Sequence, residues 1–444
     1  MNKSSNLKPA KYLLILFSIC LFSCKSGKIN PFKPASPHEQ YQRKLSSAGL
    51  DKTAMGNNWI NTANLSLQKS LTITLPFKES GYFAAEKVTA TTYRFAVTRG
   101  QKISISLSKK PIEQFMLYAD VWEEQPDGAP KHLAAADTLG NPIQLDAGAD
   151  GYYLIRLQPE LLRSGSYDLE ISNSPSLAFP VQNGGANNIQ SYFGDGRDAN
   201  SRKHEGIDIF APKRTPVLAI AEGTVTRVNQ NNLGGNVVWM RPKGKDYTLY
   251  YAHLDQQIAT EGQQVNIGDT LGLMGNTGNA RTTAPHLHFG IYTSGGAIDP
   301  LAFVKPVSKK ALVIASSLSK LNTTARTTQK TTLYKSTALN SKEGFALKPG
   351  TVMLVHAANS NLYTVELPDG DTGFIPARFT ATTEKPLRNY TIKANTQIVF
   401  NQPDSLAVVQ SRLTAGTTVG ILGDFNNYHL IISDDQQTGW IKIN

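Results

Sequence analysis

Alternating apolar and polar residues dominate the chain between residues 65 and 172. Apolar side chains recur there at every second position, as at Ile103, Ile105 and Leu107. Successive side chains of a β-strand point to opposite faces of the sheet, so this alternation is typical of strands with one buried face. Gly, Asn and Asp separate the runs, as they do at turns between strands. The pattern predicts an antiparallel β-sandwich over residues 61–176.

Shifts in composition divide the rest of the chain. Before the sandwich, residues 24–60 are expected to form a tether followed by a short helix around residues 38–50. A Gly- and Asn-rich stretch at residues 183–188 precedes a second domain, predicted over residues 185–306. Residues 307–330 are rich in Lys, Ser and Thr and are interpreted as a linker. At 444 residues the chain is too long for one hydrophobic core, so several domains are expected.

An internal repeat ends the chain. Seven positions of the stretch 347–375 carry the same residue or residue type as positions 66 residues later, in the stretch 413–441. Each copy ends in Thr-Gly-aromatic-Ile, an ending that resembles bacterial SH3-like domains. The resemblance implies two small β-barrels, over residues 331–382 and 396–444. Such modules hold cell-wall peptides or partner proteins of the envelope; the alternative is a spacer without a ligand.

The N-terminus has the pattern of a secretory signal. Three lysines precede an apolar run at Tyr12–Phe22, which is too short to span a bilayer. The run ends at Leu21-Phe22-Ser23-Cys24, which resembles a bacterial lipobox, although Phe22 stands where a small residue is usual. We therefore expect residues 1–23 to be a lipoprotein signal peptide and Cys24 to be the lipidated residue. The alternative is an ordinary signal peptide that contains Cys.

Candidate metal ligands are concentrated in the second domain. His204 and Asp208 are the first and last residues of one short motif. His286 and His288 belong to a second motif, His286–Phe289. His and Asp are common zinc ligands, and three protein ligands plus a water are typical of a catalytic zinc site. The domain contains no Cys, so a closed structural site built from thiolates is excluded.

The spacing of these residues constrains their geometry. On a straight strand His204 and Asp208 would have Cα atoms roughly 13 Å apart, so a bend is expected at Gly206. His286 and His288 are two residues apart and would lie on the same side of a strand, roughly 6.6 Å apart. Both imidazoles can then enter one site, one on the metal and the other on the substrate.

Eight short motifs follow one another through the second domain: Gly206–Ile209, Thr215–Val217, Ala221–Val225, Gly234–Asn236, Tyr251–Leu254, Gly262–Val265, Gly275–Gly278 and His286–Phe289. In this order and spacing they resemble the lysostaphin/LytM-type family of peptidoglycan zinc metallopeptidases. The resemblance covers about a quarter of the chain and implies an antiparallel β fold, so the whole protein is expected to be mainly β.

The resemblance also implies roles for five residues. His204, Asp208 and His288 would hold one Zn²⁺ per chain, while His253 and His286 would be catalytic histidines that do not bind the metal. No His-Glu-x-x-His motif supplies a glutamate base, so one of these two histidines is expected to take the proton from the attacking water. Which of them does so stays open at this point.

Two departures limit what the resemblance implies, the first about an orienting glutamate and the second about substrate. Gly290 stands where many members of the family have Glu. The segment between Gly196 and His204 is charged, whereas the family's version is rich in glycine.

The expected function is hydrolysis of peptide cross-links of bacterial peptidoglycan by an enzyme anchored in the cell envelope. A net charge of +11, or about +8 without the three signal lysines, suits an anionic membrane surface or the carboxylate-rich wall. Lys and Arg are scattered rather than interleaved with aromatics, so nucleic acid is not an expected partner. Lys25 after the lipobox, rather than Asp, favours the outer membrane or periplasm. The alternatives are a non-catalytic activator of another wall hydrolase and a wall-binding scaffold lipoprotein.

Overall fold

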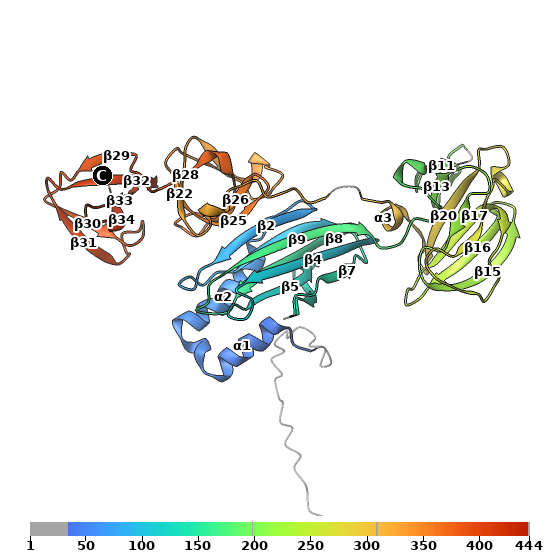
Figure 1. The fold of residues 1–444 in the computed structure, drawn as a ribbon, viewed down its shortest axis with the longest axis horizontal. Coiled ribbons are helices and arrows are strands. Elements are labelled where there is room, and N and C mark those ends of the chain that lie inside the picture. The colour runs from blue at the N-terminus through green and yellow to red at the C-terminus, as the bar shows by residue number, and fades with distance from the viewer. Residues whose placement is uncertain (1–33, 138, 198, 308–309, 443–444) are drawn as a thin grey trace, which may run out of the picture. The chain divides into compact units, whose positions relative to one another are not determined.

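The computed structural model describes residues 34–137, 139–197, 199–307 and 310–442. The protein is mainly β, as the alternating pattern predicted (Figure 1). Within the described ranges, no helix has the length and apolar character needed to cross a membrane. The predicted signal peptide and Cys24 lie outside the described residues.

Two helices precede the strands. Helix α1 (Pro37–Ser47) lies where the short helix was expected; the Ser36 side chain caps it, and Glu39 completes the capping box. A short 3₁₀ segment, η1 (Leu50–Lys52), leads to helix α2 (Ala54–Gln68), which runs across the predicted boundary at residue 60. The sequence prediction missed α2 because two of its four buried residues are Gly and Ser, so no apolar stripe marks its inner face.

Two sheets pack face to face over most of residues 71–175, and we call this part the sandwich. The first sheet has the strand order β1 (Leu71–Thr72), β3 (Thr91–Val97), β8 (Gly151–Pro159), β5 (Leu117–Glu123), β6 (Lys131–Ala135). The second contributes β2 (Phe77–Phe83), β9 (Gly165–Pro175), β4 (Gln101–Lys110) and β7 (Ile143–Asp146). Buried apolar side chains from both sheets form one core.

The second sheet of the sandwich continues into the first C-terminal repeat. Its full strand order is β27 (Thr372–Pro376), β26 (Leu362–Glu366), β25 (Val352–Asn359), β2, β9, β4, β7. Antiparallel pairing of β2 with β25 aligns Glu79 with Asn359 and Gly81 with Ala357. Two side chains of the repeat, Leu362 and Phe374, belong to the sandwich core. The sandwich and the first repeat therefore share a sheet and a core, although the sequence analysis treated them as separate domains.

The segment predicted as a linker is partly ordered into secondary structure. It contains a 3₁₀ turn, η4 (Leu318–Lys320), and strand β22 (Thr324–Thr327), which pairs with β25 and with β28 (Thr380–Thr382). Ala325 and Thr327 are buried while the residues between and before them are half-buried. The boundary at residue 330 was therefore wrong, because Thr serves as a strand residue here and the composition alone hid the alternation.

The two repeats place their matching residues at matching positions. The first also contains β23 (Thr331–Leu333), η5 (Ser341–Glu343), β24 (Phe345–Leu347) and η6 (Ala377–Phe379). The second is a six-stranded sheet in the order β29 (Arg388–Thr391), β32 (Thr418–Phe425), β33 (Tyr428–Ile432), β34 (Thr438–Lys442), β30 (Thr396–Phe400), β31 (Val409–Thr414). Gly350 and Gly416 both have positive φ, 84° and 87°, just before the long strands β25 and β32. That both repeats are SH3-like barrels stays a prediction.

The central domain is inserted in the chain between β9 and β22 and is built on a ten-stranded sheet (Figure 1). Its main path is β10 (Ile189–Ser191), β13 (Ile207–Phe210), β20 (His286–Thr293), β17 (Thr248–Gln257), β16 (Gly235–Pro242), β15 (Gly223–Asn231), β18 (Gln264–Val265). The sheet also includes β14 (Pro216–Leu218), β19 (Thr270–Met274) and β21 (Gly296–Ile298). The hairpin β11 (Gly196–Arg197) and β12 (Arg202–Lys203) and the short helical segments η2 (Ala186–Asn188), η3 (Gly278–Ala280) and α3 (Leu301–Val304) complete it.

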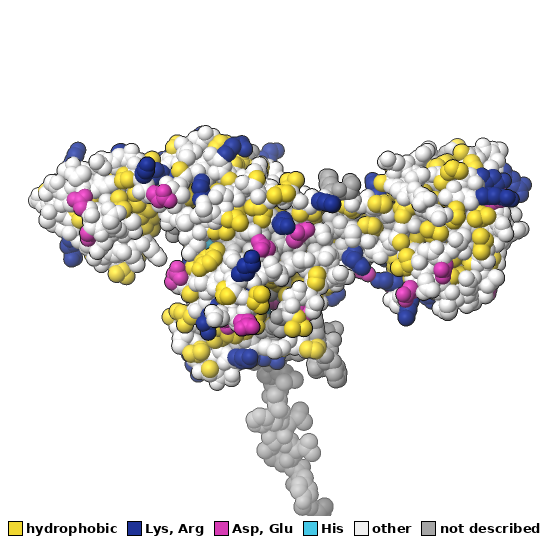
Figure 2. All heavy atoms as spheres, viewed as in Figure 1, with side chains coloured by type: hydrophobic (Ala, Val, Ile, Leu, Met, Phe, Trp, Pro, Cys, Tyr) yellow, Lys and Arg dark blue, Asp and Glu magenta, His cyan; other side chains and the backbone are white. Residues whose placement is uncertain are grey.

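The core of the central domain begins before the predicted boundary. Leu177 and Val181 are buried in it, and Val181 forms a β-bridge with Val217. The Gly- and Asn-rich stretch taken as the border at residue 185 therefore lies inside the domain. Charged side chains are interspersed over most of the face shown in Figure 2, with one dense group of Lys and Arg on the central domain.

Candidate active site

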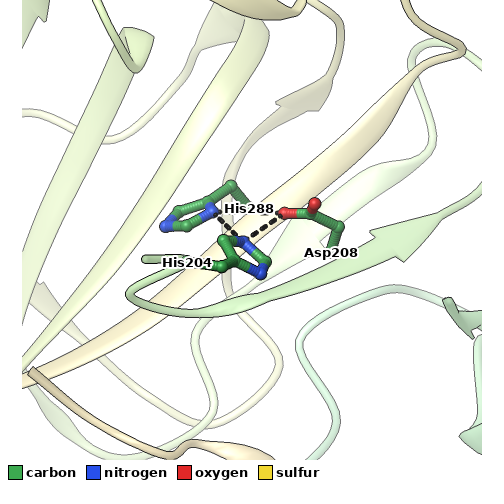
Figure 3. Close-up of side chains that lie close together, drawn as sticks. All are labelled: His204, Asp208 and His288. Atoms are coloured by element: carbon green, nitrogen blue, oxygen red, sulfur yellow. Dashed lines mark hydrogen bonds and ion pairs between the residues drawn. The ribbon is translucent and has the colours of Figure 1, made fainter. Parts of the chain in front are cut away.

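The three predicted metal ligands converge in the central domain (Figure 3). Asp208 lies on β13 and His288 on β20, and the antiparallel register of these two strands places them directly opposite each other. Cross-strand partners have Cβ atoms about 5 Å apart, so both side chains reach the same point. His204 precedes β13 and joins them from the adjoining segment.

The three ligand atoms form a nearly equilateral triangle. His204 Nε2 lies 3.0 Å from Asp208 Oδ1 and 2.9 Å from His288 Nδ1, and these last two atoms are 3.1 Å apart. Ligands at about 2.0–2.2 Å from a tetrahedral zinc lie about 3.3–3.6 Å from one another, so the triangle is slightly smaller than the one that this ion requires. Within the ranges that the structure describes, this is the one group of three or more His, Cys, Asp or Glu side chains close enough to share a metal.

Hydrogen bonds outside the triangle orient the ligands. His204 Nδ1 lies 2.8 Å from the carbonyl of Tyr192 and donates to it, so Nε2 is the ring nitrogen directed at the triangle. Arg197 Nη2 donates to Asp208 Oδ2 over 2.9 Å. Because Arg197 engages the outer carboxylate oxygen, Oδ1 is held toward the two histidines.

Gly206 allows His204 and Asp208 to meet. A Cβ at this position would lie 2.5 Å from the carbonyl oxygen of Phe289 and 2.8 Å from the imidazole of His288. Any side chain would therefore push β13 away from β20. The sequence analysis expected Gly206 to provide a bend; in the structure its essential feature is the close approach of the backbone to the neighbouring strand.

His253 and His286, the predicted catalytic histidines, lie beside the triangle. The rings of His253 and His286 are 5.0 Å apart between centroids, and the ring of His253 is 6.0 Å from that of His288. The Nδ1 of His253 lies 2.8 Å from the Thr277 carbonyl, and the Nδ1 of His286 lies 2.9 Å from the Ala284 carbonyl. In both rings Nδ1 therefore donates to a carbonyl, and Nε2 remains as an acceptor.

The backbone holds His253 in an uncommon conformation. Its φ is +62°, in the left-handed region, which a non-glycine residue adopts at a cost. The His253 amide donates to the Gly234 carbonyl over 2.7 Å, and a Cβ on the adjacent Gly235 would lie 2.2 Å from Thr277 Oγ1. Close packing of the segment at Gly234 and Gly235 against the segment at Thr277 fixes the position of His253.

Alternate side chains of strand β20 face the candidate site and the hydrophobic core, as the two-residue spacing predicted. Leu287 and Phe289 are fully buried in the hydrophobic core. His286 and His288 face the opposite side, where His286 stacks on Phe210 with ring centroids 4.9 Å apart. The alternation of one strand thus supplies one candidate ligand and one candidate catalytic group.

Burial and neighbouring charges set the protonation of the site. Burial would raise the pKa of Asp208, but hydrogen bonds with His204 and His288 and the charges of these rings hold it well below its usual range. Burial lowers the pKa of His253 to about 4, with a smaller contribution from His286. Burial also lowers the pKa of His288. The site thus favours an ionised Asp208 carboxylate, and burial favours the neutral form of His253 and His288. A divalent cation binds to deprotonated ligands of these kinds.

The triangle opens into a groove of about 770 Å³. Its lining includes all five predicted site residues, together with Arg197, Arg202, Trp239, Tyr250 and Tyr292. The ring of Tyr250 lies 5.9 Å from that of His288. Arg197 and the three aromatic residues were not predicted as site residues from the sequence. The positions of Trp239, Tyr250 and Tyr292 depend on the register of β16, β17 and β20, which no local pattern indicates.

Comparison with known proteins finds relatives of the central domain. Residues 202–300 match Peptidase family M23. The chain is 36% identical over 94 residues to the peptidoglycan DD-endopeptidase ShyC of Vibrio cholerae, a match that covers 21% of each protein. It is 37% identical over 108 residues to the uncharacterized lipoprotein YgeR of Escherichia coli, which covers 24% of this chain and 41% of that one.

A similar solved structure is the catalytic domain of lysostaphin from Staphylococcus simulans, which is 30% identical. The match has a TM-score of 0.24 and covers 27% of this chain and 93% of that domain. The chain spans about a fifth of the length of ShyC and two-fifths of that of YgeR. The resemblance inferred from the eight motifs is thus confirmed for the central domain.

Proposed function

We propose that this chain, which carries a peptidase family M23 domain at residues 202–300, is a zinc-dependent endopeptidase that hydrolyses peptide cross-links of bacterial peptidoglycan. The observation that carries the proposal is the triangle of His204, Asp208 and His288 at the floor of an open groove. Two imidazoles and one carboxylate form a donor set typical of catalytic zinc, with a fourth position left for water or substrate.

Zinc bound by these three residues would supply Lewis acidity toward the scissile carbonyl and an activated water at neutral pH. The remaining steps fall to His253 and His286. Their Nε2 atoms are free of the carbonyls that hold Nδ1, so either can accept a proton from the attacking water. The low pKa of His253 keeps that ring neutral at pH 7, as a base must be. The second histidine can then stabilise the oxyanion and protonate the leaving amine.

The rest of the chain is suited to placing this domain at the wall. We propose that Cys24 carries a lipid anchor in the cell envelope, with the outer membrane or periplasm as the favoured location. The two C-terminal repeats would hold peptidoglycan or an envelope protein. Such attachment raises the local concentration of substrate around the enzyme. YgeR, one of the similar proteins, is named as a lipoprotein.

Zinc content and hydrolysis, measured on the same preparation, test the proposal. The mature protein should contain one zinc per chain and should release soluble fragments from purified peptidoglycan sacculi. Mass spectrometry of those fragments identifies the bond that is cut. Zinc without hydrolysis would support a non-catalytic activator instead, and absence of zinc from a carefully prepared protein would overturn the enzyme proposal. Pull-down on insoluble sacculi separately tests wall binding.

A further inference from the structure

The groove does not end at the metal ligands. On β20, Gly290 and Tyr292 follow His288 at two-residue intervals and therefore share its face of the sheet. The register pairs Gly290 with Tyr250 on β17, and Tyr250 with Trp239 on β16. This face therefore extends from the candidate metal site across three neighbouring strands.

Aromatic rings form the floor next to the metal site. The ring centroids of Trp239 and Tyr250 are 4.3 Å apart, and Tyr292 lies 5.6 Å from Trp239 and 5.9 Å from Tyr250. Gly290 contributes to this arrangement, because a Cβ there would lie 2.9 Å from the ring of Tyr292 and 3.2 Å from the Glu205 carbonyl oxygen. A larger residue at position 290 would displace Tyr292 from the aromatic floor.

Two arginines follow beyond the aromatic floor. Arg227 on β15 is the cross-strand partner of Trp239, and Arg241 lies two residues after Trp239 on the same face. Both side chains are exposed. They line a hollow of about 450 Å³ that shares Trp239 and Tyr292 with the groove, so the two spaces adjoin at these two rings.

Positive charge exceeds negative charge along this extension. Asp246 is the acidic residue that lines the second hollow with Arg227 and Arg241. Arg241 also lines a third hollow of about 700 Å³, together with Glu222, Lys243 and Lys245. Lys245 is paired with Asp146 over 2.8 Å, so the lysine that adds most to the unbalanced charge is Lys243.

We propose that Arg227 and Arg241 form a subsite that binds a carboxylate of the substrate peptide, next to the aromatic floor that carries the peptide from the metal centre. This inference rests on the proposed function and narrows its substrate class to anionic peptides. A guanidinium forms charge-assisted, bidentate hydrogen bonds to a carboxylate, and two of them at one end of an apolar floor favour an extended, negatively charged ligand. An uncharged glycine bridge would make no such contact.

The subsite lies several peptide residues away from the bond that is cut. From His288 to Arg241 the path runs roughly 13 Å along the strands and roughly 10 Å across two of them. Allowing for the length of the arginine side chain, this corresponds to roughly three to five residues of extended peptide. The carboxylate recognised here therefore belongs to a residue separated from the scissile bond, and its recognition affects affinity and positioning rather than the chemical step.

Two forms of one substrate test the subsite. A cross-linked pair of synthetic stem peptides is prepared with free carboxylates and, alternatively, with those carboxylates amidated. The full-length protein, R241Q, and the double variant R227Q/R241Q are compared. R43Q, which removes an exposed arginine on α1, is the matched control. Both arginines of the subsite are exposed, so their replacement should leave the fold intact.

The parent protein should prefer the carboxylate form about tenfold in kcat/KM, and added salt should reduce this preference. The double variant should lose the preference by slowing on the carboxylate form alone, with R241Q intermediate and R43Q unchanged. Equal cleavage of both forms by the parent, or equal slowing on both forms in the double variant, would overturn the subsite.

Binding to zinc-stripped protein separates this inference from the proposed function. If the zinc-loaded parent cleaves neither form, the endopeptidase proposal fails, while fluorescence anisotropy of the labelled peptides still reports on the groove. Tighter binding of the carboxylate form that is lost in R227Q/R241Q supports the subsite in that case. Equal binding of the two forms overturns it.

Discussion

Two clusters of buried polar side chains differ in whether their hydrogen bonds are satisfied within the cluster. In the sandwich, Glu79 is fully buried and accepts hydrogen bonds from the hydroxyls of Tyr93 and Tyr167, at 2.7 and 2.9 Å. Each hydroxyl donates one bond and the carboxyl group receives both. The Glu79 side chain has no solvent-exposed surface. The cluster is closed and needs no ligand.

In the central domain two ring nitrogens and one carboxylate oxygen face one another instead. The Nε2 of His204, the Nδ1 of His288 and the Oδ1 of Asp208 lie within about 3 Å of each other. Without a proton or a cation among them these lone pairs would repel, and a groove leads directly to them. The comparison shows that burial of polar groups alone does not mark a functional site; converging acceptors with access to solvent do.

Removal of a metal ligand should have the largest effect. H288A and D208N should each lose zinc and at least about a thousandfold of hydrolytic activity, because two ligands cannot hold a catalytic zinc in a competent geometry. E79Q should retain both, since Glu79 belongs to the closed cluster. Metal analysis and release of soluble peptidoglycan fragments are measured on each variant. Full activity in H288A would contradict the assignment of that ligand.

Removal of a proposed catalytic histidine should have the next largest effect. H253A and H286A should lower turnover by about 10²–10⁴-fold, the usual contribution of a general acid or base. Zinc should stay bound, because neither residue belongs to the triangle of ligand atoms. Turnover and zinc content are measured together, with the parent protein as reference. Loss of zinc from either variant would mean that the residue is a ligand.

Local rules of strand geometry account for one part of the candidate metal site. The two-residue spacing of His286 and His288 places both on one face of a strand whatever its neighbours are. The convergence of Asp208 with His288 also depends on strand pairing, and the motif resemblance supplied that part. Arg227 and Arg241 belong to no motif, and only the register of β15, β16 and β17 places them on the groove face.

Long-range pairing also explains what the sequence analysis missed in the fold. The alternation between residues 65 and 172 predicted strands correctly, because each strand has one buried face. Nothing local indicates that β2 pairs with β25, more than 270 residues later in the chain. Edge strands present unpaired backbone groups along their whole length, so a sandwich edge can accept a strand from any part of the chain.

The smallest effect should come from the closed cluster and concern stability. Burial raises the pKa of Glu79 to about 7, against the opposing hydrogen bonds from Tyr93 and Tyr167. The folded protein therefore keeps a proton on Glu79 up to about pH 7, whereas the unfolded chain releases it near pH 4.5. Its contribution to the free energy of unfolding is fully present below pH 4.5 and falls as the pH rises to about 7, by at most about 3 kcal/mol.

Glutamine at this position has no proton to lose. The free energy of unfolding of E79Q should therefore fall less between pH 4.5 and 7.5 than that of the parent, as measured by urea unfolding at several pH values in that interval. All other titrating groups are common to the two proteins, so the difference between their slopes isolates Glu79. Parallel pH profiles would mean that Glu79 is already ionised in the folded protein, and that the closed cluster holds a buried negative charge by means of its two tyrosine hydroxyls.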